Sequence, residues 1–278
     1  MQIELPDINE IISRIEPIVS SYNGEEKTIS AWVLQQREII NNHRELVKSR
    51  TEDGDIKIFL VMLRDYLTKA MRGEMGEKVY ERLKTHIHSK TDLQYANYVA
   101  ALKEASYRWG AEIGASVIED IVDYFKNELE WNFSAYFELA EQNYRNNFKD
   151  DKLLKIRNIG YKVRDLALSS FSGKYVAFDL HLCRVPTRMG LLSYGYELIA
   201  KDLDAEHEIE MGNNPQNLKN YHFLHRLFVK LTEMTDNKYS MSDFDRFFWH
   251  FGKSFCGSKP QCDCCPVVKI CLTGRHCL

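Results

Sequence analysis

The sequence predicts an all-α protein built from two helical domains. Glycine and proline are scarce in the 278 residues, at 14 and 6. Apolar residues recur at helical spacing over long segments, and there is little of the alternation that marks half-buried strands. The chain shows neither internal repeats nor low-complexity segments, so the predicted fold class depends on these periodicities.

Helical periodicity is clearest in two segments. Residues 55–71 place their apolar side chains roughly on one face, and residues 95–125 have the same character. Gly110 and Gly114 fall within the second segment, where we expect them to interrupt the helix or to allow close packing.

Three regions follow from this pattern. Residues 1–87 are expected to form an acidic, helical N-terminal region that packs partly on the C-terminal domain. Residues 88–172 form one helical domain, and residues 173–278 form the C-terminal helical domain.

Composition predicts an intracellular protein. Hydrophobic residues make up 44% and charged residues 28% of the chain, which is ordinary for a globular protein. No apolar run approaches the ~20 residues of a membrane helix. The N-terminus is acidic and amphipathic, unlike a secretory signal or a transit peptide. We expect a monomer without a membrane partner, in the cytoplasm (associated with the nucleoid) or in the nucleus, and not secreted.

Positive charge is concentrated in two stretches. The formal net charge is -3, but residues 153–188 carry seven Lys or Arg against two Asp, and residues 252–278 carry four against one. A basic face on an acidic body can bind nucleic acid. Solvated charge on ordinary helix surfaces is the alternative explanation.

A helical hairpin is predicted around residues 153–168. The apolar residues Leu153, Leu154 and Ile156 lead into the turn Arg157-Asn158-Ile159-Gly160, after which a second apolar-faced helix begins. Asn158 and Gly160 lie where a tight turn needs left-handed backbone, and both residue types tolerate that conformation. The N–H groups of a new helix N-terminus can hold a phosphate, although an ordinary helical corner would have the same sequence.

An aspartate follows in a favourable position for a helix cap. Asp179 comes after a short apolar run and before a helical pattern, so we expect it to be an N-cap. Its neighbours Phe178 and Leu180 would partly desolvate the carboxylate, which suits electrostatic or acid–base work.

Six of the seven cysteines lie in the last 23 residues. Four of them, Cys256, Cys262, Cys265 and Cys271, have the spacing C-x5-C-x2-C-x5-C, with Cys264 and Cys277 left over. Clustered thiolates suit an iron–sulfur cluster or structural zinc. Zinc sites usually pair two short C-x2-C knuckles, and a single knuckle favours the cluster.

In this order, the hairpin, the aspartate and the cysteines resemble the helix-hairpin-helix DNA glycosylases of the endonuclease III type, over roughly residues 90–272. The family pattern L-P-G-V-G-x-K corresponds to Ile156 through Lys162, and its V-D-x-H corresponds to Phe178-Asp179-Leu180-His181. Lys162-Val-Arg-Asp is also similar to the 8-oxoguanine glycosylase branch. The chain departs from the pattern at Arg157 and Asn158, which replace Pro and Gly, and in the first cysteine gap, which is one residue shorter.

The resemblance implies a bifunctional DNA glycosylase and AP lyase acting on double-stranded DNA that contains a damaged or modified base. Lys162 would be the nucleophile and Asp179 the second catalytic residue. Cys256, Cys262, Cys265 and Cys271 would hold a 4Fe-4S cluster. The residues implied to contact DNA are Arg157, Asn158, Ile159, Gly160 and Lys259, together with Tyr107 or Arg108 as the side chain that fills the gap left by a flipped base.

Two other functions remain possible from the sequence. One is a catalytically silent helix-hairpin-helix protein that binds DNA and keeps a structural metal cluster. The other is a zinc-stabilised helical interaction module unrelated to DNA.

Overall fold

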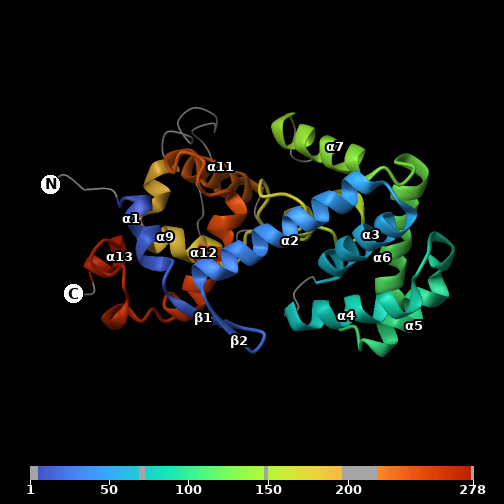
Figure 1. Cartoon of the computed structure of the whole chain (residues 1–278), viewed down its shortest axis with the longest axis horizontal. Helices are drawn as coiled ribbons and strands as arrows, with labels where there is room; N and C mark the ends of the chain where they lie inside the picture. Colours follow the sequence, from blue (N-terminus) through green and yellow to red (C-terminus); the bar gives the residue numbers. More distant parts are fainter. Residues whose placement is uncertain (1–5, 69–72, 147–149, 196–217, 277–278) are drawn as a thin grey trace. The chain divides into compact units, whose positions relative to one another are not determined.

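The computed structural model describes residues 6–68, 73–146, 150–195 and 218–276. Helices account for most of these residues, and a single two-stranded sheet accompanies them within the described ranges (Figure 1). The predicted all-α class is therefore confirmed. None of the helices in these ranges combines the length and the apolar character needed to cross a lipid bilayer.

The chain forms two compact units, one of them discontinuous in sequence. The first unit joins Met1–Glu38 to Gly173–Leu278, and the second is Ile39–Ser172. Helix α2 (Ile29–Ser49) begins in the first unit and ends in the second. This division differs from the sequence-based boundary at residue 87, because it depends on contacts between distant parts of the chain that periodicity does not reveal.

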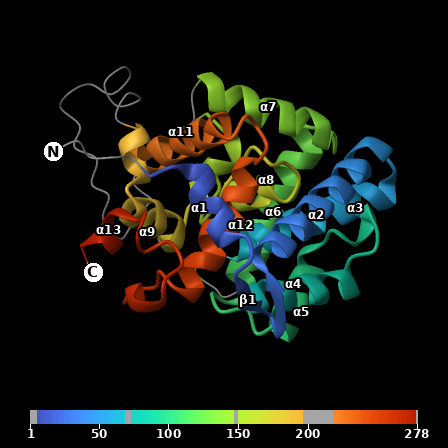
Figure 2. The same ribbon diagram turned by 60° about the vertical axis from the view of Figure 1, so that its left-hand side comes forward.

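The first unit is organised around helix α12. Its elements are α1 (Ile8–Ile15), β1 (Val19–Tyr22), β2 (Glu25–Thr28), α9 (Leu180–Met189), η4 (Leu191–Gly195), α11 (Leu218–Met234), α12 (Met241–Ser254), η5 (Cys262–Cys264) and α13 (Leu272–Arg275). Helix α12 packs against α1, α9 and α11 (Figure 2). Ser240 and Asp243 form a capping box at its start, and Phe247 and Phe248 are among its fully buried residues.

The β-hairpin formed by β1 and β2 was not predicted, because residues 1–87 were expected to be helical. Val19 pairs with Thr28 and Tyr22 with Glu25. Between the strands, Asn23 and Gly24 both have positive φ, at 50° and 81°, as a two-residue Asn-Gly hairpin turn requires. The turn was readable from the sequence, but strands of four residues are too short to show a clear alternation.

The second unit consists of helices that mostly pack on their neighbours in sequence. They are α3 (Glu52–Leu67), α4 (Gly73–His86), η1 (Lys90–Asp92), α5 (Tyr95–Glu104), α6 (Ala111–Asp123), η2 (Tyr124–Glu128), α7 (Phe133–Asn146), η3 (Lys152–Lys155) and α8 (Tyr161–Ser169). Helices α3, α4, α5 and α6 pack pairwise in that order (Figure 1). Helix α8 returns to pack on α3. This return brings the predicted hairpin back to the start of the unit.

Two glycines shape the corner between α5 and α6, as predicted. Gly110 has φ +92° and precedes α6. At Gly114, an added Cβ would lie 2.7 Å from Leu102 Cδ1 and 2.8 Å from Tyr107 Cε1. A larger residue at position 114 would displace the side chains of Leu102 and Tyr107, which occupy the space that glycine leaves.

Candidate functional site

The predicted hairpin is a short 3-10 turn followed by α8. The residues before the turn, expected as the end of a helix, form η3 instead. Asn158 has φ +71°, which confirms the left-handed backbone expected there. The same expectation for Gly160 is wrong: its φ of -109° and ψ of 177° are extended, because Gly160 is the N-cap of α8 and N-caps adopt extended backbone.

Lys162 lies in the first turn of α8 and is half-buried. Arg157, Asn158 and Gly160 are exposed beside it. Ile159 differs from them: its side chain is only 5% exposed, and its N–H donates to the carbonyl of Ile156 at 3.1 Å. The N–H of Ile159 is therefore already hydrogen-bonded within the turn. A phosphate would instead bind at the N-terminus of α8, where helix geometry leaves N–H groups without intrahelical acceptors.

A buried charge network lies beneath the hairpin. Arg164, 1% exposed, donates through Nε to Asp165 Oδ1 at 2.8 Å, and its Nη1 lies 3.5 Å from Asp151 Oδ2. Asp151 also caps η3 by accepting from the N–H of Leu153 at 2.9 Å. Burial raises the pKa of Asp151, and the charge of Arg164 opposes that rise. The network ties the segment entering the turn to the helix leaving it, and so fixes the backbone that carries Lys162.

One cavity of the second unit gathers three of the predicted DNA-binding residues. It has a volume of about 180 Å³, and Tyr107, Arg157 and Asn158 line it. Its wall also contains Tyr66, Trp109 and Ile113. We call this cavity the aromatic pocket. The exposed Arg108 does not line it, but its guanidinium carbon lies 4.9 Å from the centre of the Trp109 ring.

Asp179 is the N-cap of α9, as predicted. Its Oδ1 accepts hydrogen bonds from the N–H groups of His181 at 2.8 Å and Leu182 at 3.0 Å. The carboxylate is half-buried. Burial lowers the pKa of the nearby Arg246, but attraction to Asp245, and to a lesser degree to Asp179, raises it overall. Asp179 belongs to the first unit and Lys162 to the second.

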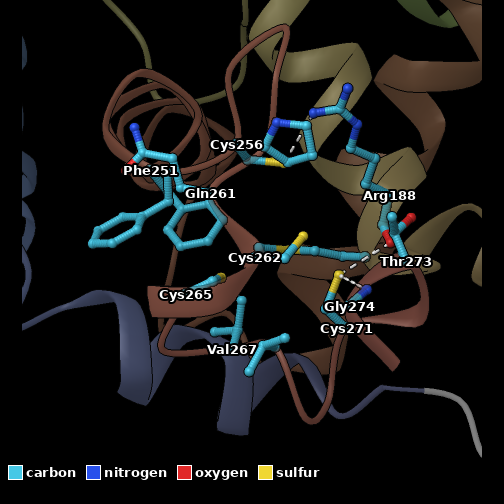
Figure 3. A pocket seen from close by; sticks show the side chains of 14 residues that line it. Arg188, Phe251, Cys256, Gln261, Cys262, Cys265, Val267, Cys271, Thr273 and Gly274 are labelled. Atoms are coloured by element: carbon cyan, nitrogen blue, oxygen red, sulfur yellow. Dashed lines mark hydrogen bonds between the residues drawn. The ribbon is translucent and has the colours of Figure 1, made fainter. Parts of the chain in front are cut away.

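The four predicted cysteine ligands line a single cavity of the first unit. The side chains of Cys256, Cys262, Cys265 and Cys271 surround a space of about 20 Å³ (Figure 3). Cys264 is exposed and does not line it, and Cys277 lies outside the described residues. The four cysteines that line the cavity are therefore the same four that the spacing selected, and Cys264 is outside both sets.

Hydrogen bonds to sulfur and to backbone carbonyls hold the loop between α12 and α13 in place. The N–H of Gly274 donates to Cys271 Sγ at 3.4 Å. Arg188, in the last turn of α9, lies 3.6 Å from Cys256 Sγ (Figure 3). Its guanidinium also donates to the carbonyls of Gly257 at 2.6 Å and Ser258 at 3.1 Å. Nothing in the sequence pattern identified Arg188 as part of this site.

Four thiol groups around one cavity are a donor set that suits an iron–sulfur cluster. Burial raises the pKa of the Cys265 thiol, and the neighbouring Cys271 and Cys256 raise it further. Phe251 and Val267 add apolar walls. No three Cys, His, Asp or Glu side chains in the described ranges are grouped tightly enough to bind one metal ion directly. Lys259 lies in the same loop and is exposed.

Comparisons with protein-family models, with curated proteins and with solved structures found no match for this chain. Besides Arg188, the sequence did not point to Tyr66 and Trp109 in the wall of the aromatic pocket. The only available signal for Trp109 was its position next to Arg108, in the segment singled out for the flipped-base gap.

Proposed function

We propose that this protein is a DNA glycosylase with AP lyase activity, which removes a damaged or modified base through a Schiff base on Lys162. The observation that carries the proposal is the position of this lysine. It lies half-buried in the first turn of α8, directly after an exposed turn rich in polar groups. A lysine nucleophile needs such access to substrate together with a rigid backbone, and the buried network around Arg164 supplies the rigidity.

In the proposed reaction, the neutral amine of Lys162 attacks C1′ of a nucleotide rotated out of the duplex. A C–N bond forms to the sugar while the bond to the base breaks, and the base leaves with a proton. Opening of the sugar ring gives the Schiff base, and loss of a C2′ proton then breaks the C3′–O bond. The carboxylate of Asp179 would stabilise the positive charge that develops on the sugar.

DNA would be held by the hairpin and by exposed cations. Arg157 and Arg108 flank the aromatic pocket in the second unit, and Lys259 extends from the cysteine loop in the first. Contacts of this type bind the phosphate backbone and carry no sequence information. The protein would act as a monomer on double-stranded DNA.

The four cysteines would hold a 4Fe-4S cluster. Bound there, the cluster would cross-link the loop between α12 and α13, since thiolate ligation couples metal binding to folding. The proposed role is structural: the loop presents Lys259, and the reaction at Lys162 does not pass through the cluster.

Borohydride trapping on DNA with an abasic site tests the proposal. Reduction of the Schiff base should leave the wild-type protein covalently attached to DNA. Lys162→Gln should abolish trapping. Its dissociation constant for DNA, measured by fluorescence anisotropy, should stay within about twofold of the wild-type value, because the amine of Lys162 is proposed to act on the sugar and not on a phosphate. Lys155→Gln, at an exposed lysine in the adjacent η3, is the matched control and should trap normally.

Metal analysis of the same preparation completes the test. Iron in excess of zinc is expected, and zinc alone would contradict the cluster. Protein that contains iron and binds DNA but does not trap would be a catalytically silent DNA-binding protein. Protein that contains zinc and does not bind DNA would be an interaction module.

A further inference from the structure

Four deeply buried polar groups of the second unit make no hydrogen bond within the described ranges. They are the hydroxyls of Tyr66 in α3, Tyr124 in η2 and Tyr136 in α7, and Oδ2 of Asp151 just before η3. Each of the four residues is at most 7% exposed. We call these residues the polar cluster. Burying a polar group without a hydrogen bond costs free energy, so nearly all such groups in folded proteins have a partner.

The members of the polar cluster lie close together although four elements contribute them. The rings of Tyr124 and Tyr136 meet edge to face, with their centroids 6.3 Å apart. The hydroxyls of Tyr66 and Tyr136 are near enough for each to shift the pKa of the other, but they do not form a hydrogen bond of normal geometry. Burial raises the pKa of all three tyrosines, and the negative charge of Asp151 raises each further. The four oxygen atoms are therefore near neighbours.

The polar cluster has more donors than acceptors. Each phenol can donate one hydrogen bond and accept another, whereas an ionised carboxylate only accepts. Asp151 uses Oδ1 to accept from the N–H of Leu153, which leaves Oδ2 facing the cluster. Arg164 Nη1 lies 3.5 Å from this Oδ2, which is beyond the usual length of a hydrogen bond. The three phenols and Oδ2 therefore need a partner that both donates and accepts.

Water meets this requirement and a cation does not. A water molecule can accept hydrogen bonds from phenols and donate one to the carboxylate, and it spans groups that do not reach one another. A metal ion accepts no hydrogen bond, so the three buried phenol hydrogens would stay unpaired. Hard cations that proteins bind through oxygen, such as calcium and magnesium, also take about six or more ligands, and the cluster offers four oxygens.

The polar cluster also has a route to solvent. Tyr66 belongs both to the cluster and to the wall of the aromatic pocket. Water can therefore reach the cluster from this pocket without unfolding of the second unit. Globular proteins hold about one buried water per 27 residues, each with about three hydrogen bonds, so a site with four polar groups is of ordinary size.

We infer that the polar cluster is a binding site for ordered water, which joins α3, η2 and α7 to the segment that enters the hairpin. Asp151 makes the last connection, because it caps η3 and lies beside Arg164 of α8. The bound water would thus help to fix the backbone on both sides of the turn. The inference does not depend on the proposed function, since it concerns only groups inside the second unit.

Removal of single hydroxyls tests the inference. Phenylalanine in place of an unpaired buried tyrosine removes an unfavourable group and should stabilise the protein, whereas the loss of a hydrogen bond to water should destabilise it. Tyr66→Phe and Tyr136→Phe should each raise the equilibrium constant for unfolding roughly fivefold in urea denaturation. The double variant should raise it by clearly less than the product of the two effects, because the hydroxyls share the same water.

Tyr98→Phe is the matched control. Tyr98 is 1% exposed, and its hydroxyl also makes no hydrogen bond to the described part of the chain. It lies in α5, and the charges that raise its pKa, after burial, are those of Glu119 and Asp123 and not that of Asp151. The stability of Tyr98→Phe should be unchanged or greater.

Oxygen-17 magnetic relaxation dispersion detects long-lived internal water directly. The double variant should hold at least one such molecule fewer than the wild-type protein, and Tyr98→Phe should hold as many as the wild-type protein.

Four results would overturn the inference. Greater stability of Tyr66→Phe and Tyr136→Phe would mean that both hydroxyls are unpaired in the folded protein. An equal loss of stability in Tyr98→Phe would make the effect a general cost of the substitution. Identical relaxation dispersion of the wild-type protein and the double variant would remove the water. Wild-type stability that falls when choline replaces potassium, with no such change in the double variant, would assign the site to a cation.

Discussion

The carboxylate of Asp179 caps α9 through one oxygen, which accepts hydrogen bonds from two backbone N–H groups. Asparagine caps helices about as well as aspartate but carries no charge. Asp179→Asn should therefore keep the free energy of unfolding within about 0.5 kcal/mol while base excision is lost. Asp179→Ala should lose excision and also about 1 kcal/mol of stability. Urea denaturation and release of the damaged base measure the two effects.

The pair of variants separates the structural role of Asp179 from the chemical one. Excision at the wild-type rate by Asp179→Asn would exclude the carboxylate from the reaction. Unchanged stability of Asp179→Ala would show that α9 does not depend on its cap.

For single residues, the sequence predicted the backbone conformation correctly where the residue type favours one conformation at that position. The cap at Asp179 and the left-handed Asn158 are examples. Gly160 was misassigned because glycine is tolerated both in left-handed turns and at N-caps. Its identity alone does not distinguish the two.

Among the elements, the loop between α12 and α13 depends on a glycine packed against backbone. A Cβ at Gly274 would lie 2.4 Å from the carbonyl oxygen of Val268, which cannot move independently of the chain. Gly274→Ala should therefore displace Cys271 and lower the iron content to less than half of the wild-type value. Gly257 lies in the loop itself, whereas Gly274 lies in α13. The nearest atoms to a Cβ added at Gly257 are 3.9 Å away, and Gly257→Ala should retain iron.

Iron content per protein, measured after identical reconstitution, compares the two alanine variants. Equal loading of both would mean that the loop adapts around Gly274 and that cluster binding does not depend on this packing.

The buried network under the hairpin gives a second prediction for an element. Arg164→Met would leave the carboxylates of Asp151 and Asp165 without their buried cation, which should cost about 3–5 kcal/mol at pH 7. Because the folded pKa of Asp151 is already raised by burial, protonation should relieve part of this loss as the pH falls. Urea denaturation of Arg164→Met at pH 7 and pH 5, with the exposed Lys155→Met as control, tests it.

A loss of stability in Arg164→Met that is independent of pH would argue against an uncompensated Asp151. A loss no larger than that of Lys155→Met would show that the network does not support the hairpin.

Periodicity predicted the long helices but not the short elements. The apolar face of residues 55–71 corresponds to α3 as far as Leu67, and residues 69–71 lie outside the described ranges. Residues 95–125 divide at Gly110 into α5 and α6. Strands β1 and β2 and the 3-10 turn η3 contain four residues each. A segment of that length does not complete two helical turns or a clear alternation, so its pattern carries little information.

At the scale of the whole molecule, His250 joins the two ends of the chain within the first unit. Its Nδ1 lies 2.9 Å from Ser20 Oγ, and its ring stacks on Trp32 at 5.2 Å. Burial, and to a lesser degree the charges of Arg246 and Lys253, lower its pKa to about 3. The folded protein therefore favours neutral histidine.

The pH dependence of stability follows from this shift. Between the unfolded pKa near 6.5 and the folded value, the unfolded chain binds the extra proton, so stability falls as the pH decreases. At pH 5, wild-type protein should have lost roughly 2 kcal/mol relative to pH 7 through this group. His250→Gln, which cannot titrate, should lose less over the same interval in urea denaturation. Parallel curves for the two proteins would show that His250 titrates normally in the fold.

The sequence did not predict that the first unit is made of two segments separated along the chain by the second unit. Helix periodicity reports on neighbours a few residues apart, whereas the contact between Ser20 and His250 spans 230 positions. The grouping of the cysteines was easier to predict, because the four that line the cavity lie within 16 residues of one another and their spacing already set them apart.

The nested arrangement of the units has a consequence for biosynthesis. Ile39–Ser172 is continuous, so this unit can complete its core while the rest of the chain is still being translated. Met1–Glu38 is synthesised before this unit but finds its packing partners only after Gly173–Leu278 has followed. At about 5–20 residues per second, that delay is roughly 12–48 s. During this interval α1 and the β-hairpin expose their apolar side chains at the ribosome, where a chaperone would have its main opportunity to act.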